Sequence, residues 1–245
     1  MENMKFETIL RNVSAVISGI LVYLMAGVFY MNAKGFQVMD NGEIVLVRPA
    51  AAQETAQEPK EIPLNYAFPQ DHALGSADAP VTLYEYSSFA CFHCADFHLD
   101  VLPKLKAEYI DKGILRVVFV PFPLDKGSMD AALLAECVDE DKYFDFADVL
   151  FKKQRDWGMS FQQQKVLMQY AALSGLSTEK AKACLKNDIT AARILKDRQS
   201  GVSDLGIAGT PSFVVSSKKE NEMVYGFRNF DDFKVIIESH LQENN

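Results

Sequence analysis

The most informative stretch of this 245-residue chain is Val81-Thr82-Leu83-Tyr84-Glu85-Tyr86-Ser87-Ser88-Phe89-Ala90-Cys91-Phe92-His93-Cys94. Its first six residues form an apolar, β-prone run that predicts a strand, whereas residues 95–106 have a helical pattern. Cys91 and Cys94 therefore lie where a strand gives way to a helix. The first helical turn has free N–H groups and a positive dipole end, which favour a thiolate over a thiol. Two thiols at this spacing can form a disulfide, so the pair is a candidate redox centre.

The two cysteines are expected to differ in role. Cys91 lies nearer the helix end, so we expect it to be more exposed and to act as the nucleophile. Cys94 lies one turn further in and would resolve a mixed disulfide. A rival interpretation takes four zinc ligands from Cys91, His93, Cys94 and His98. Within one helix, however, Cys94 and His98 share a face while His93 points elsewhere, which does not suit a tetrahedral ion. We therefore predict no metal site, and we expect His98 to be a solvated helix residue.

Composition limits the class of protein. The chain is 49% hydrophobic, which is enough for one sizeable core with an inserted subdomain. Its formal net charge of -8, without a cluster of Lys and Arg, argues against nucleic acid as a partner.

The first 34 residues predict a membrane anchor. No charged residue lies between Arg11 and Lys34, and residues 13–31 are nearly all apolar. At about 1.5 Å per residue, this run matches the ~30 Å hydrocarbon core of a bilayer. Lys5 and Arg11 precede it, which weakly places the rest of the chain outside the cytoplasm. The alternative is a cleaved signal peptide, but the region around residues 32–34 is a poor cleavage site.

The segment from 35 to 73 is predicted to be a juxtamembrane hairpin followed by a flexible linker. Residues 36–39 and 43–47 are expected to form two short strands, joined at residues 40–42, where Asn41-Gly42 suits a tight type I′ turn. Residues 48–63 are rich in Ala, Gln, Glu and Pro, which is typical of a tether.

The remaining residues, 74–243, predict an α/β domain. Strands are expected at 81–86, 114–120, 212–216 and 222–225. Helices are expected from residue 95 to 106, then at 128–138, 141–153, 160–173, 177–186, 190–205 and 229–241. The order β-α-β, helical block, β-β-α implies a mixed sheet covered by helices, with a helical insertion at about 127–200.

Three blocks of this domain resemble the DsbA-like branch of the thioredoxin superfamily. They are Leu74-Gly75-Ser76-Ala77-Asp78-Ala79-Pro80-Val81, Glu85-Tyr86-Ser87-Ser88-Phe89-Ala90-Cys91-Phe92-His93-Cys94 and Gly209-Thr210-Pro211-Ser212-Phe213. The resemblance covers roughly 74–240. It implies a thioredoxin-like fold with an inserted α-helical subdomain, here preceded by a single transmembrane helix. Members of this branch are periplasmic or extracytoplasmic thiol-disulfide oxidoreductases.

The resemblance also implies residue roles. Cys91 attacks, Cys94 resolves, and His93 helps to hold the thiolate. Thr210 and Pro211 correspond to a cis-proline loop that faces the cysteines and offers backbone groups to an extended substrate chain.

Two further positions of the motif bear on the site. Glu85 resembles a buried acid beneath the cysteines that accepts a proton, and its basic partner is left open, with Arg116 on the next strand as a candidate. Phe92 departs from the Pro of the best-known members, which leaves the redox poise open, and it is a candidate for substrate contact.

Cys137 and Cys184 lie on separate predicted helices. An even cysteine count in an oxidising compartment favours a second, structural disulfide between them. Two unrelated buried thiols are the alternative.

These features together predict an extracytoplasmic oxidase that passes the Cys91–Cys94 disulfide to reduced substrate proteins. We expect it on the periplasmic side of the bacterial inner membrane, or soluble in the periplasm if the first segment is cleaved. Reoxidation would need a partner such as a DsbB-like, quinone-linked membrane protein, and no organic cofactor is implied. The alternatives are a disulfide isomerase or reductase of the same fold, and a binding or chaperone module in which the thiols are incidental.

Overall fold

The computed structural model describes residues 36–38, 44–46, 61–70 and 72–242. The chain divides into two compact units, residues 1–58 and 59–245. In the first unit, β1 (Phe36–Val38) pairs antiparallel with β2 (Ile44–Leu46), as predicted for the hairpin. Its turn and the apolar segment predicted to span the membrane lie outside the described residues. Among the helices that are described, none is both long and apolar enough to cross a bilayer.

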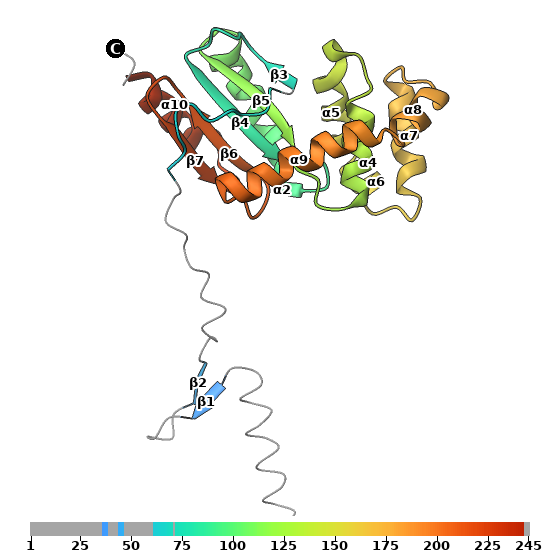
Figure 1. Ribbon diagram of the computed structural model, residues 1–245, viewed down its shortest axis with the longest axis horizontal. Helices are drawn as coiled ribbons and strands as arrows, with labels where there is room; N and C mark the ends of the chain where they lie inside the picture. Colours follow the sequence, from blue (N-terminus) through green and yellow to red (C-terminus); the bar gives the residue numbers. More distant parts are fainter. Residues whose placement is uncertain (1–35, 39–43, 47–60, 71, 243–245) are drawn as a thin grey trace, which may run out of the picture. The chain divides into compact units, whose positions relative to one another are not determined.

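The second unit is built on a five-stranded sheet in the order β3-β5-β4-β6-β7 (Figure 1). The strands are β3 (His72–Leu74), β4 (Val81–Ser87), β5 (Leu115–Pro121), β6 (Ser212–Ser216) and β7 (Asn221–Tyr225). Central β4 runs parallel to β5 and antiparallel to β6, with Glu85 opposite Phe119 and Phe213. Such a strand is covered on both faces, which explains its nearly continuous apolar sequence.

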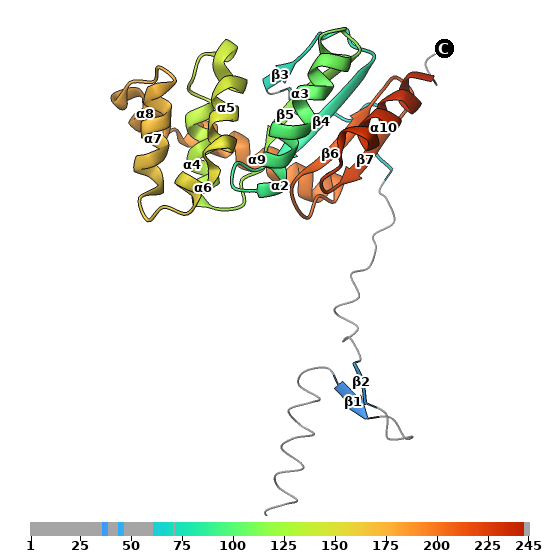
Figure 2. The ribbon, with the colours of Figure 1, turned by 180° about the vertical axis from the view of Figure 1, so that it is seen from behind.

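Helices cover both faces of this sheet (Figures 1 and 2). On one face lies a continuous helical segment of alternating α and π turns, with α10 (Phe230–Gln242) beside it. The segment consists of α2 (Phe92–Asp96), η2 (Phe97–Val101), α3 (Leu102–Leu105) and η3 (Lys106–Ile110). The end of α9 (Asp188–Leu205) lies on the opposite face. Because side chains alternate along a strand, Leu83 packs with Phe97 and Phe233, whereas Tyr84 and Tyr86 pack with Leu205.

A helical block is inserted between β5 and β6, as predicted. It contains α4 (Lys126–Ala135), the 3-10 turn η4 (Glu140–Lys142), α5 (Tyr143–Lys152), α6 (Gln154–Gly158), α7 (Gln163–Leu173) and α8 (Thr178–Cys184). Fully buried Trp157 lies in its core. Cys137 and Cys184, the pair expected to form a second disulfide, are bonded to each other. The long helix α9 then leads from this block back to the sheet (Figure 1).

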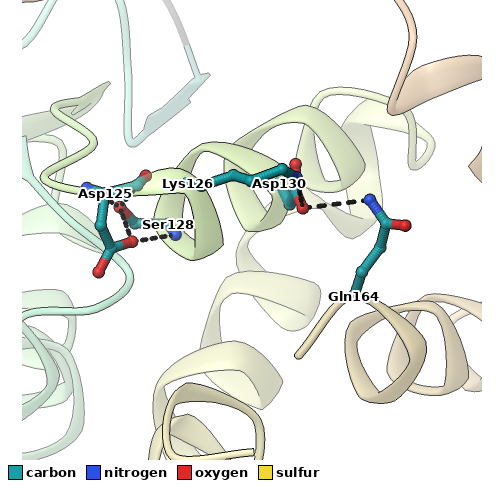
Figure 3. A network of polar contacts seen from close by, with 5 residues as sticks. All are labelled: Asp125, Lys126, Ser128, Asp130 and Gln164. Carbon is teal, nitrogen blue, oxygen red and sulfur yellow. Dashed lines mark hydrogen bonds and ion pairs between the residues drawn. The ribbon is translucent and has the colours of Figure 1, made fainter. Parts of the chain in front are cut away.

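The start of α4 is held by a capping box (Figure 3). The backbone N–H of Ser128 donates to Asp125 Oδ1 at 2.7 Å, and the Asp125 N–H donates to Ser128 Oγ at 3.0 Å. One turn later, Asp130 pairs with Lys126 at 2.6 Å and accepts a hydrogen bond from Gln164 at 3.2 Å. The first contacts satisfy free N–H groups at the helix end, and the last one ties α7 to α4.

The linker predicted to reach residue 73 ends earlier. Ile62 and Phe68 are buried, and the Phe68 ring stacks on Tyr84 of β4 with centroids 4.2 Å apart. The short strand β3, which the sequence did not indicate, pairs with β5 at the sheet edge. Single apolar residues between Pro and polar residues carry no periodic signal, so this segment was missed. The helix predicted at 160–173 begins only at Gln163, and α6 precedes it as a separate element.

Candidate functional site

Cys91 is the N-cap residue of α2, directly after the loop that leaves β4. Its backbone is extended, with φ -87° and ψ 123°, and its side chain is partly exposed. Cys94 lies one turn further along and is completely buried against the inserted helices. Both cysteines are free thiols. Cys91 is thus the more exposed cysteine of the pair and Cys94 the buried one, as the sequence predicts.

Several groups stabilise a thiolate at Cys91. A hydrogen bond from the Cys94 thiol is the main reason that the pKa of Cys91 falls from 9.0 to about 5. Partial burial opposes this fall, while Thr210 and the backbone N–H groups of Cys94 and His93 add to it. Hydrogen bonds to the charged form always favour ionisation, and these N–H groups are the free donors of the helix start.

Cys94 is affected in the opposite direction. Burial raises its pKa well above 9.0, and the hydrogen bond and charge of Cys91 and the charge of Glu85 raise it further, while Ser87 acts against them. Cys91 is therefore the thiolate and Cys94 the protonated thiol near neutral pH. This asymmetry defines which sulfur can attack and which must first lose a proton.

His93 helps to lower the pKa of Cys91 through its backbone N–H. Its ring is 70% exposed and lies 3.3 Å from Asp96 Oδ2, with the Phe227 ring 6.2 Å away between centroids. The contribution to the Cys91 pKa comes from the His93 N–H at the helix start. The expected role in holding the thiolate thus falls to a group that any residue except Pro would supply at this position.

The Thr210–Pro211 peptide bond is cis and lies beside the redox pair. Cys91 Sγ lies 3.2 Å from the carbonyl oxygen of Thr210, 119 residues away in sequence, and donates a hydrogen bond to it when Cys91 is protonated. The loop is fixed from both sides, because Gly226 N–H donates to the Pro211 carbonyl at 2.9 Å and the Ser212 hydroxyl donates to the Gly209 carbonyl at 2.8 Å. Thr210 and Pro211 are therefore placed where the resemblance expects them.

The buried acid has a partner that the sequence analysis missed. Glu85 is fully buried and accepts a hydrogen bond from His98 Nε2 at 3.0 Å. His98 is buried too, so the prediction of a solvated histidine is wrong. Cys94 and His98 lie one turn apart on the same helix face, and that face packs inward. Arg116, the candidate partner, instead donates to Gln70 at 3.3 Å on the exposed side.

The second ring nitrogen of buried His98 faces a carboxylate that is partly exposed to solvent. His98 Nδ1 lies 3.9 Å from Oδ1 of Asp148 on α5. Burial works to lower the pKa of His98, but the charge of Glu85, the hydrogen bond to Glu85 and the nearby Asp148 carboxylate outweigh it and raise the pKa to about 9. The imidazole is thus a cation between two carboxylates at neutral pH. Within the described ranges, no three His, Cys, Asp or Glu side chains are placed to share a metal ion.

The inserted block contributes two residues that no local sequence pattern indicates. The side-chain amide of Gln154 on α6 donates to the carbonyl oxygens of Phe89 and Cys91, at 2.7 and 2.9 Å. Next to it, the Arg155 guanidinium lies 5.8 Å from the ring centroid of Phe92, which is 55% exposed beside the reactive sulfur. The insertion therefore forms one wall of the site.

Disulfide exchange requires a thiolate of lowered pKa, a protonated partner thiol and a backbone loop beside the reactive sulfur, and all three occur at this site. The chain is a thiol-disulfide oxidoreductase. Residues 68–239 match the family model described as Thioredoxin. The chain belongs to this family. Its fold is the DsbA-like form, in which a helical subdomain is inserted into the thioredoxin fold.

One relative and two solved structures illustrate this relationship. The Bacillus subtilis disulfide bond formation protein D is 32% identical over 174 residues, covering 69% of this chain and 76% of that protein. A crystal structure of Wolbachia pipientis alpha-DsbA1 superposes with a TM-score of 0.67 at 30% identity, covering 74% of this chain and 95% of that one. Oxidised BdbD from Bacillus subtilis gives a TM-score of 0.62 at 31% identity over 70% of this chain and 93% of its own.

Proposed function

We propose that this oxidoreductase works outside the cytoplasm and inserts disulfides into secreted or periplasmic proteins. The observation that carries the proposal is the unequal acidity of the two thiols, with the pKa of Cys91 near 5 and that of buried Cys94 well above 9.0. A stabilised Cys91 thiolate makes the reduced form of the pair favourable. The disulfide form is then a strong oxidant.

The reaction proceeds by two exchanges. A substrate thiolate attacks Cys91 Sγ, breaks the Cys91–Cys94 bond and leaves a mixed disulfide, while the released Cys94 sulfur takes up a proton. A second substrate thiolate then attacks the substrate sulfur of the mixed disulfide and expels Cys91 as a thiolate. Two electrons pass from the substrate dithiol to the enzyme. The low Cys91 pKa speeds the second exchange, because a more acidic thiol leaves faster.

Substrate is expected to lie between Phe92 and the proline loop. Phe92 presents an exposed apolar ring next to Cys91, and the carbonyl oxygen of Thr210 lies 3.2 Å from the Cys91 sulfur. An extended chain in this position could contact both while its thiol approaches Cys91. Binding through one ring and a backbone loop suits unfolded proteins of varied sequence.

The uncharged segment at 13–31 supports attachment to the inner membrane by the first 34 residues, with the catalytic unit on the periplasmic side. The alternative is release into the periplasm after cleavage. Reoxidation of the reduced pair needs an electron acceptor, and a DsbB-like, quinone-linked membrane protein fits this need. Fractionation of cells and the mass of the mature protein's N-terminus would separate an anchored from a cleaved form.

The decisive measurement is the redox potential of the Cys91–Cys94 pair against glutathione. We expect a value nearer to about -120 mV, as in DsbA, than to about -270 mV, as in thioredoxin. A value as reducing as that of thioredoxin would contradict the oxidase and favour an isomerase or reductase.

Two matched variants test the assignment of the thiols. Cys94→Ser should accumulate mixed disulfides with substrate proteins, whereas Cys91→Ser should form none and lose activity. Unchanged activity of Cys91→Ser would instead favour a binding module.

A further inference from the structure

Three ionisable side chains lie in a row between the buried thiol and the protein surface. Glu85 on β4 and His98 on η2 form the inner pair, and Asp148 on α5 is the outer member, with its side chain 43% exposed. The resemblance implies a proton acceptor at Glu85 and assigns nothing to His98 or Asp148. The buried ion pair of Glu85 and His98 is thus connected to solvent through the carboxylate of Asp148.

The inner end of the row acts on Cys94. Cys94 lies one turn before His98 on the inward helix face, and His98 binds Glu85. The charge of Glu85 is one of the causes that raise the pKa of Cys94. Glu85 binds His98 through Oε2, and its second oxygen, Oε1, has no hydrogen-bond partner among the described residues. A buried carboxylate oxygen without a hydrogen-bond partner is costly and needs a physical explanation. Oε1 of Glu85 is therefore the atom that can take up a proton.

The outer end of the row reaches water. The charged groups that face His98 are Glu85 from β4 and Asp148 from α5, and the rings of Phe97, Phe119 and Phe151 enclose it otherwise. Asp148 in turn faces Lys152 at 3.9 Å on the surface. The imidazole thus has one nitrogen toward an inner carboxylate and the other toward an outer one.

We propose that His98 and Asp148 form the proton exit for Cys94. This inference rests on the proposed exchange at Cys91 and Cys94. When reduced protein resolves a mixed disulfide, the Cys94 thiol gives its proton to Glu85 and its sulfur attacks Cys91. The bond between Cys91 and the partner sulfur breaks, and the partner leaves as a thiolate. The new Cys91–Cys94 bond leaves the enzyme pair oxidised and the partner reduced.

The proton then leaves without creating net charge in the interior. Once Glu85 is neutral, burial dominates at His98, and the imidazolium gives its Nδ1 proton to Asp148, which passes it to water. The charged Glu85–His98 pair becomes a neutral one. In the opposite direction, Glu85 returns the proton to a Cys94 thiolate and His98 recovers one from Asp148. A buried pair can change in this way at low cost, whereas a lone buried charge cannot.

The test uses the full-length protein in its reduced state and glutathione disulfide as the probe. Cys91 forms a mixed disulfide with glutathione, and Cys94 then resolves it. Both steps are followed by acid quenching and mass spectrometry between pH 5 and pH 9. The test variant is Asp148→Asn, and Asp145→Asn is its control, because Asp145 is an exposed carboxylate on the same helix.

We expect Asp148→Asn to form the mixed disulfide at the wild-type rate and to resolve it about tenfold more slowly at pH 7. Its resolution should have an altered pH profile, and Asp145→Asn should behave like wild type in both steps. A second variant, His98→Gln, keeps a hydrogen-bonding group near Glu85 but cannot carry a proton, so it should also resolve slowly.

Wild-type resolution rates and an unchanged pH profile in Asp148→Asn would overturn the proposal, even if His98→Gln fails to fold. Failure of the proposed exchange at Cys91 looks different, because wild-type protein would then form no mixed disulfide with glutathione.

Discussion

The side-chain amide of Gln154 donates a 2.9 Å hydrogen bond to the carbonyl oxygen of Cys91, although 63 residues separate the two in sequence. The same nitrogen donates to the carbonyl of Phe89 at 2.7 Å. One residue of the inserted block therefore satisfies two carbonyls of the loop that carries the nucleophile. Because unsatisfied buried carbonyls are costly, this contact fixes the loop to the insertion.

We expect Gln154→Ala to lower the free energy of unfolding by about 1–3 kcal/mol, since the buried Phe89 carbonyl loses its side-chain donor, whereas the Cys91 carbonyl keeps the Ala95 N–H. The rate at which Cys91 reacts with iodoacetamide should also change, because the loop loses its restraint. Gln162→Ala, at an exposed position before α7, is the control. Urea titrations and alkylation rates measure both effects, and equal stability of the two variants would contradict the prediction.

The redox pair and the proline loop could be predicted from the sequence because their signals are local. Cys91 and Cys94 lie in one short motif between a clear strand and a helix, and Thr210 and Pro211 belong to a block that resembles a known loop. Gln154 could not be found this way, because only the folded insertion brings α6 to the cysteines.

His98 was missed for a different reason. The helical period puts His98 on the same face as Cys94, yet the prediction treats this face as solvated at His98 and inward at Cys94. The polar side chain suggested exposure, whereas the helical period required burial. A buried polar residue needs a partner, and Glu85 four residues into the preceding strand was the available one.

The thiolate at Cys91 should persist in mildly acidic solution. We expect the absorbance of reduced protein at 240 nm to titrate with a pKa of about 5, because Cys94 and the helix N–H groups stabilise the charge. A pKa below the unfolded value adds stability as pH rises. The reduced protein should therefore gain stability relative to the oxidised protein from pH 5 to pH 8 and lose this advantage as pH falls through 5. Parallel unfolding curves at pH 5 and 8 check this, and a constant difference would contradict it.

The Glu85–His98 pair predicts the opposite pH dependence in oxidised protein, where the redox cysteines do not titrate. The pKa of His98 is raised from 6.5 to about 9, so its contribution to stability is complete below pH 6.5 and is lost as pH rises through 9. Oxidised wild type should be less stable at pH 9 than at pH 6.5 in urea. Glu85→Gln removes the charge that contributes most to raising the pKa of His98. The oxidised variant should therefore lose most of the dependence of stability on pH. The same decline in both proteins would show that other groups cause it.

The disulfide between Cys137 and Cys184 is expected to stabilise the insertion without taking part in exchange. It closes a loop with a sequence separation of 47 residues, and the chain-entropy relation for that length gives about 4 kcal/mol. The double variant Cys137→Ala/Cys184→Ala should therefore lose about 4 kcal/mol of free energy of unfolding and unfold at a lower urea concentration. Because the bond lies away from Cys91, its Cys91–Cys94 potential should equal that of wild type. A changed potential with unchanged stability would assign this bond to the redox chemistry instead.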